Sequence, residues 1–125
     1  MSGLGAGLGY DATPPFSAPL RFFLSAPLFS AAAGGLLLAD PGLLDSRWTP
    51  GALATIHLLA LGFLLQVMLG ALLQILPVVA GASFRAPLRV AGLTHAGLCA
   101  GSLALTLGFL TGAPALLQLG GGLLD

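Results

Sequence analysis

Long uncharged runs dominate this chain and divide it into segments. Three runs of mostly apolar residues lie at about 19–39, 50–77 and 87–110. An α-helix needs about 20 such residues to cross about 30 Å of hydrocarbon. A fourth apolar run, 113–124, is too short to cross at about 12 residues. The pattern therefore predicts an all-α integral membrane protein with three transmembrane helices and a short apolar C-terminal segment.

The residues at the ends of these runs support the same boundaries. Thr49 followed by Pro50 is a typical helix start, with a capping hydroxyl before a proline at the first helical position, and Pro87 can open the third helix likewise. The turn residues 40–42 and Pro77 are expected to mark the ends of the first two helices. Residues 1–18 are rich in Gly, Pro and Ala, which predicts a flexible or surface-lying tail. Residues 19–125 then form one helical transmembrane domain.

Composition agrees with a membrane protein and excludes several other classes. Of the 125 residues, 57% are hydrophobic and 6% are charged, whereas soluble domains carry about a quarter charged residues. The charges are four Arg and four Asp, so the formal net charge is zero. Nucleic acid is not an expected partner, because no basic surface exists to neutralise phosphates. The single cysteine, Cys99, excludes an intrachain disulfide and a cysteine-based zinc site.

The arginines predict an orientation in the membrane. Three spans put Arg21, Arg85 and Arg89 on one side and Arg47 on the other. Short loops rich in Lys and Arg stay in the cytoplasm, so we expect the N-terminus to be cytoplasmic. Trp48 is then placed as an interfacial anchor near the outer surface.

Small and amide-bearing residues recur at helical spacing within the spans. They are Gly62, Gln66, Gly70 and Gln74 in the second span, and Gly97 and Gly101 in the third. Small residues let two backbones approach closely, and glutamines can hydrogen-bond across a helix interface. We expect these six residues to serve helix packing with other membrane helices rather than chemistry.

The two histidines are the candidate functional residues, because ionisable groups within membrane spans are rare. His57 stands seven residues into the second span, which places it about 10 Å deep at 1.5 Å per residue, in the predicted outer leaflet. At α-helical spacing it points about 180° away from Gln66. Its imidazole is either a neutral group hydrogen-bonded to an adjacent helix or a cofactor ligand.

His95 shares one face of the third span with Cys99, Ser102 and Thr106. Such a stripe lines either a cofactor, which makes His95 a second candidate binding residue, or a helix contact. His57 and His95 differ by roughly 10 Å in expected depth in a 30 Å core, so they are not expected to ligate one haem iron together. Each would need a partner from another helix or subunit.

A resemblance to a known family comes from the second span. The segment 54–63 (ATIHLLALGF), and the following helix that ends in LPVV at 76–79, resemble the second helix of haem-copper oxidase subunit I. The likeness is closest to the cbb-type and nitric-oxide-reductase branch and to NnrS-like membrane proteins, whose first helix starts similarly to PLRFF at 19–23. In that family an H-x-x-x-x-G-F stretch near the outer surface supplies an axial ligand to haem b. The resemblance implies that His57 ligates a haem b iron in the bacterial cytoplasmic membrane.

The same resemblance also limits the expected function. Family members have about a dozen helices and several further histidines for their active centre, whereas this chain has 2 histidines. It is therefore not expected to be a complete oxidase or nitric-oxide reductase on its own. It is either the amino-terminal part of a longer protein or a small relative that joins an oligomer or larger complex.

Two functional hypotheses follow from the sequence. The first is a haem-b-binding membrane subunit for electron transfer or gas sensing, in which Gly62 or Gly70 makes room for the porphyrin or for a packed helix. The second is a cofactor-free packing subunit of a respiratory or photosynthetic membrane complex, which docks on partner helices through its small-residue faces.

Overall fold

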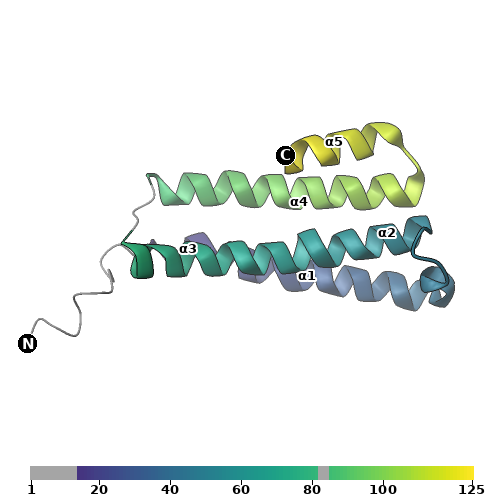
Figure 1. Ribbon diagram of the computed structural model, residues 1–125, viewed down its shortest axis with the longest axis horizontal. Helices are drawn as coiled ribbons and strands as arrows, with labels where there is room; N and C mark the ends of the chain where they lie inside the picture. Colours follow the sequence, from purple (N-terminus) through teal and green to yellow (C-terminus); the bar gives the residue numbers. More distant parts are fainter. Residues whose placement is uncertain (1–13, 82–84) are drawn as a thin grey trace, which may run out of the picture.

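The computed structural model describes residues 14–81 and 85–125, and every regular element in them is helical. In chain order these are α1 (Ser17–Ala39), the 3₁₀ turn η2 (Pro41–Leu44), α2 (Pro50–His57), the π-helix η3 (Leu58–Leu65), α3 (Gln66–Ala80), α4 (Pro87–Thr111) and α5 (Pro114–Leu124). The elements α2, η3 and α3 run end to end as one 31-residue rod (Figure 1). The three long helices are each long and apolar enough to cross a membrane. The all-α membrane fold with a short apolar C-terminal helix is confirmed.

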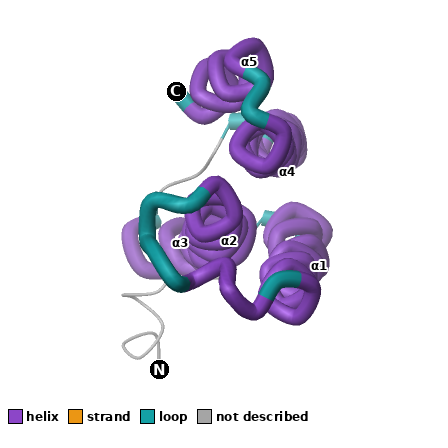
Figure 2. Tube along the Cα trace, turned by 90° about the vertical axis from the view of Figure 1, so that its right-hand side faces the viewer, coloured by secondary structure: helices purple, strands orange, loops and turns teal. Residues whose placement is uncertain are grey.

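The helices are stacked one level over another (Figures 1 and 2). In one layer α1 lies beside the rod, and α4 packs over both. Helix α5 lies on the side of α4 that faces away from α1 and the rod. Large apolar side chains such as Leu28 (70% exposed) and Leu38 (86% exposed) cover the outer surface. So much exposed apolar surface fits contact with lipid rather than water.

The helix ends follow the expected capping chemistry, with one correction. Thr49 caps α2, since its Oγ1 accepts a hydrogen bond from the Ala52 backbone N–H at 3.1 Å. The second span was expected to end at Pro77, and this is wrong, because α3 continues to Ala80. It stops there because Gly81 adopts a left-handed conformation, with φ of 62°, that terminates helices. Of the tail expected for 1–18, residues 1–13 lie outside the described part, and Ser17 already belongs to α1.

Aromatic side chains of α1 fill the spaces left by two glycines of the rod. A Cβ added to Gly62 would lie 2.5 Å from Phe29, and one added to Gly70 would lie 3.0 Å from Phe23. The glycines therefore let α1 and the rod approach closely. A phenylalanine of α1 occupies each space, so these positions pack against a helix and leave no room for a porphyrin.

Glycines of α4 serve in the same way against α5. A Cβ on Gly101 would lie 2.7 Å from Leu124, and one on Gly108 would lie 2.8 Å from Leu117. Gly97 faces the Leu123 backbone oxygen, at 3.6 Å from its would-be Cβ. The pairing shows that α5 runs antiparallel to α4. Both glycines of the 97–101 pair thus lie at a contact within the chain.

Candidate functional site

Four polar side chains from three helices meet inside the bundle. Ser25 comes from α1, Gln66 from the first turn of α3, and His95 and Cys99 from α4. The Ser25 Oγ lies 2.8 Å from His95 Nε2 and is hydrogen-bonded to Gln66 Oε1. Gln66 Nε2 donates to Cys99 Sγ at 3.6 Å, and the same sulfur lies 3.5 Å from His95 Nε2. These four residues are named the polar cluster below.

One arrangement of protons satisfies the polar cluster. His95 Nε2–H donates to Ser25 Oγ, Ser25 O–H donates to Gln66 Oε1, and the Gln66 amide donates to Cys99 Sγ. Gln66 is 0% exposed, so its amide has no access to water. Because an unpaired amide in an apolar interior is costly, these partners define how the three helices fit together.

His95 is held by this cluster and by an aromatic neighbour. The Phe22 ring meets the imidazole edge-on, with ring centroids 5.2 Å apart. Of the stripe expected on α4, Thr106 Oγ1 donates to the Ser102 carbonyl at 2.8 Å, while the buried Ser102 hydroxyl has no partner among the described residues. Of this polar face, His95 and Cys99 bond to other helices, whereas Ser102 and Thr106 make no hydrogen bond to another described helix.

His57 stands apart from the polar cluster at the end of α2. Its Nδ1 lies 2.7 Å from the Leu53 carbonyl oxygen. A carbonyl only accepts, so Nδ1 carries the proton and Nε2 of the neutral ring carries the lone pair. The ring packs on Phe109 of α4, with centroids 4.9 Å apart and planes tilted by 39°. The half-buried imidazole thus presents its basic nitrogen away from its own helix.

The π-helix η3 changes the faces predicted for the second span. The expected 180° between His57 and Gln66 assumes α-helical spacing, but the eight residues between them, Leu58–Leu65, are π-helical. A π-helix is wider and advances less around its axis per residue. His57 and Gln66 both contact α4, at Phe109 and Cys99 respectively. The prediction that His57 points opposite to Gln66 is therefore wrong.

The structure keeps the two histidines apart. His57 packs on Phe109 of α4. Phe109 and His95 are separated by about 21 Å along the axis of α4, at 1.5 Å per residue. One iron cannot be ligated by both, as expected. Within residues 14–81 and 85–125 no group of three or more His, Cys, Asp or Glu side chains gathers to hold a metal ion.

Sequence reasoning missed Ser25. A serine in an apolar helix can donate its hydroxyl proton to the carbonyl four residues earlier, and the Arg21 carbonyl oxygen does lie 2.9 Å from Ser25 Oγ. Its role therefore emerges only from the neighbouring helices. Gln66 was singled out for its spacing, but the spacing does not reveal that its partners are Ser25 and Cys99.

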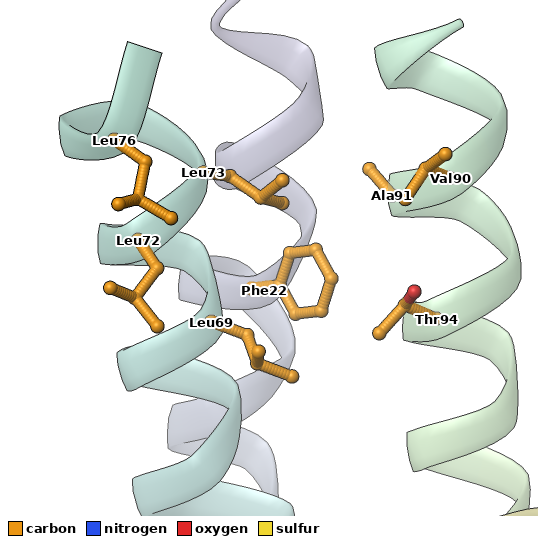
Figure 3. A pocket seen from close by; sticks show the side chains of 8 residues that line it. All are labelled: Phe22, Leu69, Leu72, Leu73, Leu76, Val90, Ala91 and Thr94. Atoms are coloured by element: carbon orange, nitrogen blue, oxygen red, sulfur yellow. The ribbon is translucent and has the colours of Figure 1, made fainter. Parts of the chain in front are cut away.

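Two apolar cavities lie on either side of the helix contacts made by α1. One, of about 230 Å³, lies between α3 and α4 and is walled by Phe22 of α1 (Figure 3). Phe22 is also the ring that meets His95 edge-on. The other, of about 340 Å³, is an open groove where α1, η3 and α4 meet, and both Ser25 and Cys99 line it. The polar cluster therefore borders the groove.

No protein-family model, curated protein or solved structure matches this chain.

Proposed function

We propose that this chain is a membrane subunit that binds haem b through His57, for electron transfer or gas sensing, as part of an oligomer or larger complex. It would reside in the bacterial cytoplasmic membrane with a cytoplasmic N-terminus, as the distribution of arginines favours.

The observation that carries this proposal is the hydrogen bond from His57 Nδ1 to the Leu53 carbonyl, at 2.7 Å. Histidines that ligate metals usually donate their other ring N–H to a carbonyl or carboxylate, which fixes the tautomer and raises the basicity of the ligating nitrogen. His57 has this arrangement, with Nε2 directed away from Leu53. The resemblance of segment 54–63 to the haem-ligating helix of haem-copper oxidases adds independent support.

His57 would hold the haem iron, and its neighbour on α4 supplies part of an apolar surface. Phe109 supplies an apolar ring beside the imidazole. His57 lines neither of the two cavities next to α1. Haem would therefore be held by His57 at the surface of the bundle, together with a ligand from a partner chain. Bound haem would supply a one-electron iron centre, whose potential depends on that ligand and on burial.

An absorption spectrum of the full chain, purified from haem-sufficient membranes, tests the proposal. We expect a Soret band and reduced haem b bands in the wild type, lost in His57→Ala. His95→Ala is the matched control and keeps the bands, because His95 lies in the polar cluster. A correctly folded wild-type protein without haem, whether alone or with its co-purifying partners, would refute the proposal.

A cofactor-free packing role is the second candidate, and the end of α1 favours it. A Cβ at Gly34 or Gly35 would meet nothing within 4 Å, and Ala31 and Ala32 beside them are exposed. This surface, unlike the glycines of the rod and α4, is free for a partner helix. On this hypothesis Gly35→Leu prevents assembly into the complex, whereas His57→Ala leaves assembly intact.

A further inference from the structure

The groove between α1 and α4 has one polar end and apolar walls. Its walls are Leu28, Phe29 and Ala32 of α1, Leu58 of η3 and Leu103 of α4, and Ser25 and Cys99 line its polar end. Leu28 is 70% exposed and Leu103 is 51% exposed, so the groove opens to the outer surface of the bundle. In a membrane this surface faces lipid.

Arg21 lies one helical turn beyond the polar end. Its Nη1 lies against α4 at Gly92, where an added Cβ would be only 3.0 Å away. On α1 the residues 21, 25, 28 and 32 share one face, because steps of three and four residues return to the same side of a helix. On α4 Gly92, Cys99 and Leu103 share a face for the same reason. The Arg21 guanidinium therefore stands at the head of the groove.

The groove and Arg21 together span about one leaflet of a bilayer. From Arg21 to Ala32 the rise along α1 is about 16 Å at 1.5 Å per residue. This is about half of the 30 Å hydrocarbon core. A charged group bound at Arg21 would sit at the membrane surface, while a chain attached to it would reach the middle of the bilayer along the groove.

The charges at this end select an anion. Arg85 and Arg89 stand at the start of α4, next to the end of the bundle where α1 begins. The carboxylates Asp40 and Asp45 follow α1 at the opposite end. The third described carboxylate, Asp125, lies at the same end of the bundle as Arg21, but on another face of α4, where it lines a separate cavity with Leu93 and Gly97. A lipid phosphate is the anion that is both abundant at this depth and attached to an apolar chain.

We propose that the α1–α4 groove is a binding site for one anionic phospholipid, with its phosphate at Arg21 and one acyl chain along Leu28, Ala32 and Leu103. The site is independent of haem. Arg89 supplies further positive potential at the headgroup, and the exposed edge of Cys99 is covered by the bound chain.

The single thiol provides the assay. The full chain is reconstituted in nanodiscs of phosphatidylcholine, with or without phosphatidylglycerol of the same acyl chains, and the rate of Cys99 alkylation by a lipid-soluble maleimide is measured. We expect phosphatidylglycerol to slow alkylation several-fold and inorganic phosphate to leave it unchanged. Native mass spectrometry should find one retained phosphatidylglycerol.

Two variants and one control distinguish this site from general lipid contact. Arg21→Gln should abolish the protection of Cys99 and the retained lipid, and Ala32→Phe should do the same by filling the groove without altering charge. Arg47→Gln, at the other end of the bundle, should behave as wild type. Equal rates of Cys99 alkylation in the two lipid mixtures would overturn the proposal. It would also be overturned if phosphatidylglycerol protected Cys99 in both Arg21→Gln and Ala32→Phe as fully as in the wild type.

Discussion

The contact between Gly62 and Phe29 yields the sharpest test of the packing between α1 and the rod. In Gly62→Ala the new Cβ would lie 2.5 Å from Phe29 Cγ and 2.7 Å from Phe29 Cβ. These atoms are close to the α1 backbone, so the ring cannot simply rotate away and the helices must separate. Overpacking of this kind costs about 1–3 kcal/mol.

Gly34→Ala is the matched control, because a Cβ there meets nothing within 4 Å. Both substitutions gain up to about 1 kcal/mol of helix propensity. The difference between the two variants therefore isolates the contact with Phe29 and should equal about 1–3 kcal/mol in the free energy of unfolding.

Unfolding of the isolated chain can be followed in mixed micelles by titration with sodium dodecyl sulfate. Helix content by circular dichroism and exposure of Cys99 to a thiol-reactive dye give two independent signals, since Cys99 is half-buried among the helices. Gly62→Ala should unfold at lower detergent fraction than Gly34→Ala. If the two variants unfold together, the close approach of α1 and the rod at Gly62 is refuted.

Two further predictions concern the polar cluster and α5. Gln66→Leu removes the hydrogen-bond partner of Ser25 and Cys99 and should lower the free energy of unfolding by about 1 kcal/mol. Gln74→Leu should be neutral or stabilising, because the buried Gln74 Oε1 has no partner among the described residues. A Gln74→Leu protein that unfolds before the Gln66→Leu protein in the same detergent titration would contradict the polar cluster. Gly120→Ala would place a Cβ 2.9 Å from the Leu105 backbone nitrogen, so the amides of α5 should exchange hydrogen faster than in the wild type, while Gly121→Ala, which meets nothing within 4 Å, should leave their exchange unchanged.

The sequence by itself determined the three spans, because hydrocarbon thickness sets the length of any helix that crosses it. It also determined the start of α2, since Thr49 and Pro50 act through their own backbone neighbours. The end at Pro77 could not be predicted in the same way. Proline removes one helical hydrogen bond, and a membrane helix tolerates this loss when its surroundings compensate.

Only the tertiary structure decided which faces meet. The π-helix between His57 and Gln66 changes the angle between these two side chains around the helix axis. No pattern of residues in this segment predicts a π-helix. Ser25 becomes part of the polar cluster because α1 brings it to Gln66 and His95, which are 41 and 70 residues away in the sequence. The sequence shows that the apolar stretch after Thr111 is too short to cross the membrane. Its packing against Gly101 and Gly108 is decided by the structure, because it requires the chain to reverse direction at Gly112. Spacing within one helix specifies a face, whereas the partner of that face depends on the other helices.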